Sequence, residues 1–194
     1  MEGFANHAGT TPMDQRRDAL LSAAAFVQMV NRVVRAEPGR QVGTVGQIRA
    51  EPGAPNVIPG RVTMSLELRD LDAPKVRRLY ETIAREAKGI GDANGTTFAF
   101  ATLTDHGPAL TDPRMQRIVA DAAGALALTS KVMPSGAGHD AQEMARLAPS
   151  GMIFVPSVGG ISHSPRELTK PADCVNGANV LLGAVLAADA APLG

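Results

Sequence analysis

The stretch Arg61-Val-Thr-Met-Ser-Leu-Glu-Leu-Arg-Asp70 decides the interpretation of the first half of the chain. Apolar residues occupy every second position from Val62 to Leu68, which is the period of a strand with one buried face. Asp72 and Pro74 follow at once, in the order of an N-cap and a first-turn proline, so we expect a helix from Asp72 to about Gly89.

The segments on either side of this strand extend the pattern. Apolar residues at three-to-four spacing predict a helix over Arg17 to Arg35. Alternation predicts strands over Gln41 to Ala50 and Thr96 to Thr104. A turn segment rich in Pro and Gly, at residues 51–60, connects the first of these to the strand at 61–70. With a further strand already under way at residue 1, this order predicts a split β-α-β unit, an α+β fold with an antiparallel sheet and helices on one face.

After His106-Gly-Pro108 the pattern changes. We expect a helix from Asp112-Pro113 to about Leu128, a short buried strand over Gly151 to Pro156, and a helix rich in small residues over Asn176 to Ala191. This is the pattern of an α/β domain with parallel strands. A parallel sheet needs both faces covered, and a segment with one or two strands cannot provide this. We therefore interpret residues 109–194 as the tail of a larger domain, with the apolar faces of residues 153–155 and of the last helix left uncovered.

Composition excludes several classes of function. Nineteen basic residues balance nineteen acidic ones and aromatic residues make up only 3%, which argues against binding to nucleic acid or to an anionic membrane surface. The single cysteine, Cys174, cannot form an internal disulfide and favours a reducing compartment. No leader pattern follows Met1, and the apolar stretch from Val180 to Ala191 is expected to be too short to span a bilayer. We therefore expect a soluble cytoplasmic protein.

Three of the four histidines lie among small residues, where a loop follows a strand or a turn. His163, after Gly159-Gly-Ile-Ser, has the setting of a metal ligand, with Glu167 placed to hold the other ring nitrogen. The alternative is a loop histidine bonded to backbone, and one histidine alone is not a zinc site. His139 follows two glycines that let a ligand approach, and Asp140 could orient its ring; the alternative is a turn with a helix starting at Asp140.

Three further polar positions, His7, Asn56 and Arg69, have two interpretations each. His7, ahead of a helix start near Met13, could donate to a developing oxyanion or could serve the turn alone. Asn56 is either a turn residue or a ligand for substrate. Arg69 is either a surface charge paired with Asp70 or a bidentate clamp for a carboxylate. Arg16 and Arg17 are expected on a solvated helix face.

These motifs, in this order, resemble the metal-dependent amidohydrolases of the M20 type. Within that family the motif sequences are similar to those of the branch of N-carbamoyl-L-amino acid hydrolase, allantoate amidohydrolase and β-ureidopropionase. The resemblance runs from end to end and is carried by Gly3-Phe-Ala-Asn-His-Ala-Gly-Thr-Thr-Pro-Met13, Arg16-Arg-Asp-Ala19, Pro55-Asn-Val-Ile-Pro-Gly60, Glu67-Leu-Arg-Asp70, Pro134-Ser-Gly-Ala-Gly-His-Asp-Ala141, Met152-Ile-Phe-Val-Pro-Ser157 and Gly159-Gly-Ile-Ser-His-Ser-Pro165.

The resemblance implies a two-domain enzyme. Residues 1–107 would form a ferredoxin-like α+β lid that also makes a homodimer, and residues 108–194 the C-terminal part of the α/β catalytic domain. The intact enzyme would hold two divalent metal ions per subunit (Zn, Mn, Co or Ni) and use metal-activated water on N-carbamoyl-L-amino acids, allantoate or a related ureido acid.

The resemblance also assigns residue roles. His163 matches a metal ligand, and His7 matches the lid histidine that reaches the partner subunit's active site and polarises the scissile carbonyl. Asn56 and Arg69 match residues that bind the substrate's carboxylate. Gly138 and His139 match a substrate-contacting loop.

The sequence departs from the family in one large respect. The family's His-x-Asp pair, bridging Asp, Glu-Glu pair and another His come from the first half of the catalytic domain and have no match here. We therefore expect a truncated gene product or a fragment, inactive by itself. The alternatives are a non-catalytic dimerisation or binding remnant and an M20 peptidase or aminoacylase, although the wording around His7 and His139 favours the carbamoylase branch.

Overall fold

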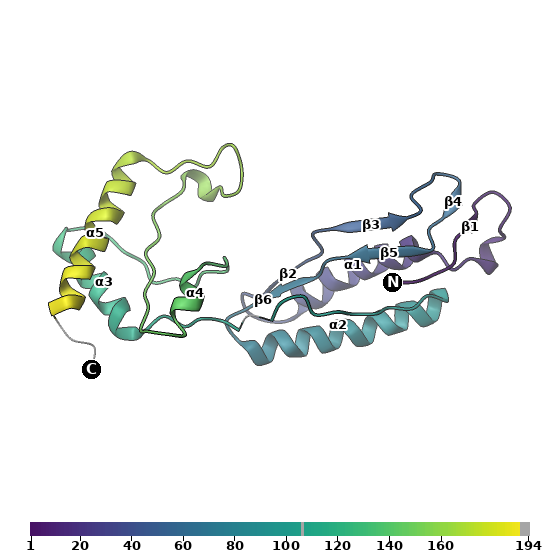
Figure 1. The fold of residues 1–194 in the computed structure, drawn as a ribbon, viewed down its shortest axis with the longest axis horizontal. Helices are drawn as coiled ribbons and strands as arrows, with labels where there is room; N and C mark the ends of the chain where they lie inside the picture. Colours follow the sequence, from purple (N-terminus) through teal and green to yellow (C-terminus); the bar gives the residue numbers. More distant parts are fainter. Residues whose placement is uncertain (106, 191–194) are drawn as a thin grey trace. The chain divides into compact units, whose positions relative to one another are not determined.

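The computed structural model describes residues 1–105 and 107–190, and the chain divides into two compact units, residues 1–108 and 109–194 (Figure 1). The predicted break at His106 and the predicted helix end at Ala191 fall on residues outside the described ones.

Two capped helices dominate the first unit. Helix α1 (Ala19–Ala36) begins at Asp18, whose carboxylate accepts the amides of Leu20 and Leu21 at 2.8 and 3.1 Å. Helix α2 (Ala73–Asn94) begins at Asp72, which accepts the amide of Lys75 at 3.1 Å. Both predicted helices are therefore confirmed. Each begins where an aspartate side chain satisfies backbone amides that would otherwise lack a partner.

The predicted end of the second helix near Gly89 is wrong. The buried stripe of α2 continues through Ala87 to Gly91, and the helix ends only at Gly95, which adopts a left-handed φ of 63°. At Gly91 a Cβ would lie 2.6 Å from the carbonyl oxygen of Thr96, so a residue without a side chain lets the following segment return against the helix.

Within residues 1–105 and 107–190, six short strands form three antiparallel pairs. Strand β1 (Asn6–His7) pairs with β4 (Val57–Ile58), β2 (Val42–Thr44) with β6 (Glu67–Arg69), and β3 (Ile48–Glu51) with β5 (Arg61–Met64). Each of the two long strands predicted at 41–50 and 61–70 is therefore two strands. At the break the Ser65 hydroxyl, in place of its carbonyl, accepts the Gln47 amide at 3.0 Å, while the Ser65 amide donates to the Gln47 carbonyl at 3.2 Å. The segment 51–60, predicted as a turn, contains β4.

Single bridges complete the sheet. Glu2 bridges both Arg61 of β5 and Thr97, so the order across the sheet is Thr97, Glu2, β5, β3, as expected for a split β-α-β unit. The predicted strand over 96–104 is wrong beyond this bridge. Phe98 and Phe100 instead pack on Phe26 of α1, with ring centroids 5.5 and 6.1 Å apart.

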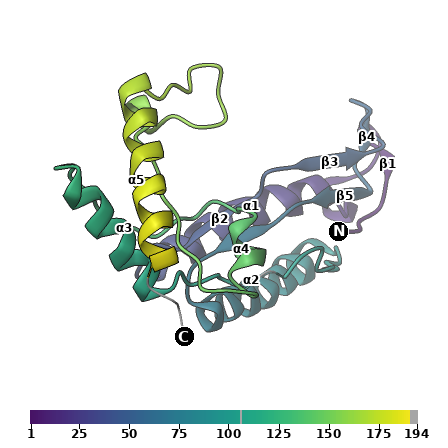
Figure 2. The same cartoon turned by 60° about the vertical axis from the view of Figure 1, so that its left-hand side comes forward.

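The core of this unit lies between α1, α2 and the strands (Figures 1 and 2). Its largest fully buried apolar side chains are Val30, Ile83 and Val62, from α1, α2 and β5 respectively. Partly buried residues of the strands, among them Met64 and Leu68, close the cluster from the sheet side. The first unit thus has a complete apolar core of its own.

The second unit has helices α3 (Pro113–Ala125), α4 (Ala141–Met144) and α5 (Pro171–Ala190), and a 3-10 turn, η2 (Val158–Gly160). Helix α3 ends short of the predicted Leu128, and α5 begins before the predicted Asn176. No strand is formed within residues 109–190, so the buried strand predicted over 151–156 is wrong. Phe154 is 55% exposed, because an isolated strand has no neighbour with which to pair.

Helix α5 packs on α3 along one narrow side and leaves the rest open. A Cβ at Gly183 of α5 would lie 3.4 Å from Ala122 of α3, in ordinary contact. The uncovered apolar faces predicted from the sequence are confirmed by the exposed residues Phe154, Val155, Val175, Leu181, Leu182, Val185 and Leu186. By length and composition α5 could cross a membrane, contrary to the expectation for this stretch, but the core helix of a larger soluble domain passes the same test.

Truncation of Ile83, which is 0% exposed, should lower the free energy of unfolding of the first unit by about 2–5 kcal/mol because it leaves a cavity in the core. Urea unfolding of Ile83→Ala followed by tyrosine fluorescence measures this, because Tyr80 is the only tyrosine and the chain has no tryptophan. Leu21→Ala, at a position 59% exposed, is the control and should cost less than about 1 kcal/mol. Equal losses in the two variants would contradict this assignment of the core.

A partly buried ion pair predicts how this unit responds to acid. Lys75 Nζ donates to Asp70 Oδ2 at 2.9 Å, with side chains only 13% and 11% exposed. This hydrogen bond, and then the Asp72 amide, hold the pKa of Asp70 below its usual value. The carboxylate therefore stabilises the fold above the unfolded pKa near 4, and this contribution is lost as pH falls through the folded pKa.

Replacing Lys75 with Met should flatten that dependence. Between pH 6 and pH 3 the free energy of unfolding, followed through Tyr80, should fall less steeply in Lys75→Met than in the wild type. Lys88→Met is the matched control, because it removes the exposed Lys88–Asp92 pair at 2.6 Å. Parallel acid profiles for the wild type and Lys75→Met would rule out this role for Asp70.

Candidate functional site

His7 ends β1 and begins a tight turn over residues 7–11. Its Nδ1 accepts the Gly9 amide at 3.0 Å, and its carbonyl oxygen accepts the Thr11 hydroxyl at 2.7 Å. Since Nδ1 is an acceptor, the proton of the neutral ring lies on Nε2. The exposed ring therefore presents an N–H donor.

Asn56 lies beside His7. Strands β1 and β4 place His7 opposite Val57, and the Ala8 amide donates to the Asn56 carbonyl at 2.9 Å. Two predicted site residues that are 49 positions apart in the sequence are thus brought together at one end of the first unit, where Figure 1 shows β1 and β4. Both side chains are exposed.

Arg16 does not lie on a solvated helix face as predicted. It precedes α1, and its guanidinium donates to the carbonyls of Ala8 at 2.6 Å and Thr11 at 3.0 and 3.1 Å. The helix start predicted near Met13 is only the short 3-10 turn η1 (Met13–Gln15). Arg17 lies over the ring of Phe4, 5.2 Å from its centroid.

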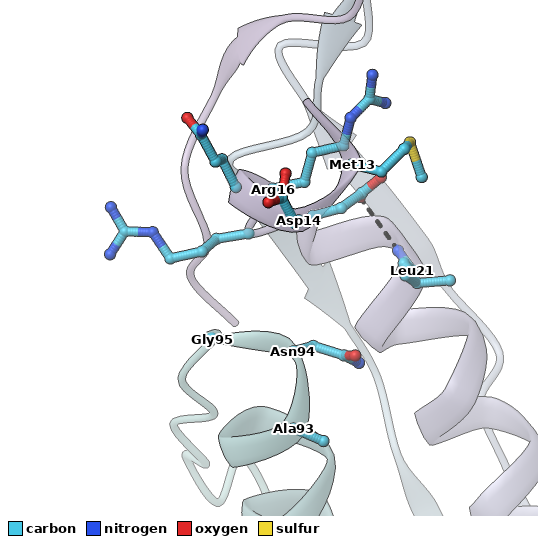
Figure 3. Close-up of a pocket in the computed structure, with 10 residues that line it drawn as sticks. Met13, Asp14, Arg16, Leu21, Ala93, Asn94 and Gly95 are labelled. Carbon is cyan, nitrogen blue, oxygen red and sulfur yellow. Dashed lines mark hydrogen bonds between the residues drawn. The ribbon is translucent and has the colours of Figure 1, made fainter. Parts of the chain in front are cut away.

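A hollow of about 550 Å³ lies next to Arg16. Figure 3 shows Met13, Asp14 and Arg16 along one side of it and Ala93 to Gly95, at the end of α2, along another. The Asp18 carboxylate in its lining is already used to cap α1. None of the predicted site residues lines this hollow, so we interpret it as the junction between the two helices.

Arg69 pairs with a different residue from the one predicted. Its Nε donates to Glu67 Oε1 at 2.9 Å, whereas Asp70 pairs with Lys75. Residues two apart in a strand share a face, so Glu67 and Arg69 of β6 meet while Asp70 turns away. The guanidinium is exposed at the surface of the first unit.

His139 of the second unit repeats the geometry of His7. Its Nδ1 accepts the amide of Ala141 at 3.0 Å, and its own amide donates to Gln142 Oε1 at 3.1 Å. The ring is thus oriented by a backbone amide and not by Asp140, which is the N-cap position of α4. The helix start at Asp140 is confirmed. Gly138 directly precedes His139 and is exposed in the loop before this helix.

His163 has a left-handed backbone, with φ 54°, after Gly159 and Gly160 at φ 68° and 67°. Such a conformation costs a residue with a side chain about 1–3 kcal/mol. Glu167 Oε2 accepts the His163 amide at 2.7 Å and so helps to hold it. The prediction that Glu167 would hold the ring is wrong, because the carboxylate binds the backbone.

A two-metal centre does not fit the residues present. Within 1–105 and 107–190, no three His, Cys, Asp or Glu side chains converge on a point. A divalent metal in a hydrolase needs about three protein ligands, so His163 cannot hold one with the described partners.

Sequence reasoning missed Arg16 and Gly9, which shape the turn around His7. The only available signal was the spacing, a glycine two residues after a histidine and an arginine after the Thr-Thr-Pro turn, and it does not indicate which carbonyls the arginine binds.

Comparison with known proteins finds one matching family and relatives that are named as hydrolases. Residues 6–187 match the family described as Peptidase family M20/M25/M40. The N-carbamoyl-L-amino acid amidohydrolase of Geobacillus stearothermophilus is 39% identical over 179 residues, which are 92% of this chain and 44% of that protein. The allantoate amidohydrolase of Escherichia coli is 33% identical over 186 residues, which are 93% of this chain and 44% of that protein.

Solved structures agree with this comparison. The crystal structure of an amidase of the hydantoinase/carbamoylase family from Burkholderia vietnamiensis has a TM-score of 0.91 at 36% identity, and the match covers 96% of this chain and 45% of that one. The chain therefore spans less than half the length of the relatives it matches.

The contact between Glu167 and His163 predicts a local effect. In Glu167→Ala the His163 amide loses its acceptor, so hydrogen exchange over residues 161–168 should accelerate about tenfold while α3 and α5 keep their protection. Exchange read by mass spectrometry measures both. Glu143→Ala, which removes the exposed pair with Arg146 at 3.0 Å, should leave residues 161–168 unchanged.

Proposed function

This chain belongs to peptidase family M20/M25/M40, and we propose that it is part of an amidohydrolase that cleaves the linear amide bond of N-carbamoyl-L-amino acids, allantoate or a related ureido acid. The observation that carries the proposal is the similarity to hydrolases of these names over at least 92% of the chain. The His7 turn and the His139 loop lie inside the matched stretch of residues 6–187.

We assign the two units different parts in this enzyme. Residues 1–107 form the lid and the homodimer contact, which is supported by a complete apolar core. Residues 108–194 form the C-terminal part of the catalytic domain, which is supported by the uncovered apolar side chains of α5 and residues 154–155. The single cysteine supports a cytoplasmic location.

The side chains on the lid bind the substrate and polarise it. Nε2–H of His7 donates to the carbonyl oxygen, where negative charge develops as the bond is attacked. Arg69 and Asn56 bind the carboxylate, for which a planar guanidinium is suited. Gly138 and His139 are assigned a substrate-contacting role as well, and the His139 ring also has Nε2–H as its free donor.

Divalent metal ions (Zn, Mn, Co or Ni) would activate the attacking water in such an enzyme. The described residues offer His163 as a ligand without the others that a pair of metals needs. We propose that the chain alone therefore neither retains a metal pair nor hydrolyses substrate.

A non-catalytic dimerisation or binding module is the second candidate. It is favoured by the contrast between the complete core of the first unit and the lack of a convergent ligand set among the described residues. An M20 peptidase or aminoacylase is the third, and it differs from the proposal in its substrate.

Metal content tests the proposal that the chain alone does not retain a metal pair. After loading with Mn²⁺ or Zn²⁺ and exhaustive dialysis, the chain should retain well below one metal per molecule by elemental analysis, and His163→Ala should retain no less. About two metals per chain would show that the chain carries its own site and would overturn the assignment of His163 as a lone ligand.

A chimera tests the substrate class. Placing this chain behind the remaining part of the Geobacillus stearothermophilus enzyme should give hydrolysis of N-carbamoyl-L-amino acids or allantoate in the presence of Mn²⁺, with dipeptides and N-acetyl amino acids cleaved far more slowly. In that chimera, His7→Ala should lower kcat about 10²–10³-fold, the usual effect of removing an oxyanion donor. Preference for dipeptides would favour the peptidase alternative, and a folded, metal-loaded chimera without any hydrolysis would favour the binding module.

A further inference from the structure

We propose that Arg16 is the positioning residue of His7: by binding two carbonyls of the turn over residues 7–11, it holds the ring with Nδ1 bonded to Gly9 and Nε2–H facing outward. This inference rests on the proposed role of His7 as the donor to the substrate carbonyl. It adds the group that fixes which ring nitrogen is presented.

Arg16 clamps the turn over residues 7–11 through two backbone carbonyls. Arg16 Nη2 donates to the Ala8 carbonyl at 2.6 Å and the Thr11 carbonyl at 3.0 Å, and Nε donates to Thr11 at 3.1 Å. The two carbonyls belong to residues three apart, on opposite sides of the turn. Hydrogen bonds from a charged donor are about twice as strong as neutral ones, and a planar fork can bridge two acceptors in fixed directions.

The clamped turn contains the Gly9 amide, which holds the His7 ring. Between Ala8 and Thr11 lies Gly9, whose amide donates to His7 Nδ1 at 3.0 Å. A Cβ on Gly9 would lie 3.2 Å from Cε1 of the His7 ring, so the ring rests against a backbone with no side chain. Any change in the separation of the Ala8 and Thr11 carbonyls would move the Gly9 amide away from Nδ1.

Arg16 is anchored by its position next to the start of α1. Arg16 is half-buried and lies two residues before Asp18, the cap of α1. The neighbouring backbone is tied to the rest of the unit, since the Phe4 amide donates to the Arg17 carbonyl at 2.8 Å and the Ala19 amide to the Pro59 carbonyl at 3.0 Å. The turn that carries the exposed His7 is thereby connected to the start of a helix in the core.

His139 provides a comparison within the same chain. Its Nδ1 also accepts an amide two residues ahead, that of Ala141, but this amide begins α4 and is positioned by the helix. The turn after His7 contains no helix start that could place the Gly9 amide. The Arg16 clamp adds a constraint to the turn's own bond from the Thr11 amide to the His7 carbonyl at 3.1 Å, because it also fixes the Ala8 carbonyl next to Gly9.

The test is nitrogen NMR of the whole chain with ¹⁵N-labelled histidine at a pH where the rings are neutral. In the wild type, His7 should show an unprotonated Nδ1 and a protonated Nε2. In Arg16→Ala the two ring nitrogens of His7 should shift toward the averaged values of a free imidazole, and the Gly9 amide should exchange with water about tenfold faster. His139 should not change in either readout.

Two further variants separate positioning from a general effect on stability. Arg16→Lys keeps the charge but cannot bridge both carbonyls, so it should restore less than half of the wild-type shift. Arg17→Ala removes the neighbouring arginine, which lies on Phe4; it should leave the His7 ring as in the wild type. Protection of the Val62 amide in β5 reports whether each variant is folded.

An unchanged His7 spectrum and Gly9 exchange rate in folded Arg16→Ala or Arg16→Lys would overturn the proposal. So would an equal change in Arg17→Ala. None of these readouts uses substrate or metal, so they stand apart from the chimera experiment. Hydrolysis by the chimera could fail while Arg16 is confirmed as the residue that fixes the ring, and the reverse could also occur.

Discussion

Packing of two apolar helix stripes against one antiparallel sheet is the interaction on which the first unit depends. Val30, Ile83 and Val62 contribute one fully buried side chain each from α1, α2 and β5. The turn over residues 7–11 lies outside this core and has almost no buried apolar surface of its own, so its geometry has to be imposed through hydrogen bonds. Those bonds come from within the turn, where the His7 carbonyl accepts the Thr11 amide and hydroxyl, from the Asn56 carbonyl just before β4, and from Arg16 beside the first turn of α1.

The second unit lacks a comparable constraint. Its buried apolar side chains within the described residues are Ala123, Val180 and Ala184, all small or medium in size. Most of the apolar surface of α5 is exposed, including Leu181, Leu182, Val185 and Leu186. His139 and His163 therefore depend on local contacts, the Ala141 amide for one and the Glu167 carboxylate for the other.

Local signals in the sequence predicted helices better than strands. Asp18, Asp72 and Asp112 each cap a helix through bonds to amides two or three residues ahead, which the chain satisfies without help from elsewhere. A strand needs a partner. The strand predicted over 151–156 has none among the described residues, and the long strands were divided by a Ser65 hydroxyl bond that alternation cannot reveal. The end of α2 was misplaced because Gly89, where the sequence predicted the stop, lies inside the helix, and only Gly95 adopts the left-handed conformation that ends it.

For the candidate site, residue types were predictable and partners were not. Histidines among small residues indicated presented rings, yet neither Glu167 nor Asp140 binds the ring assigned to it; one holds a backbone amide and the other begins a helix. What His7 and His139 share is simpler: an amide two residues ahead occupies Nδ1 and leaves Nε2–H outward. A donor fixed in this way needs no reorganisation when charge develops on a substrate oxygen. The chain thus holds its hydrogen-bond donors in place through its own backbone, although the described residues supply no set of ligands for a metal.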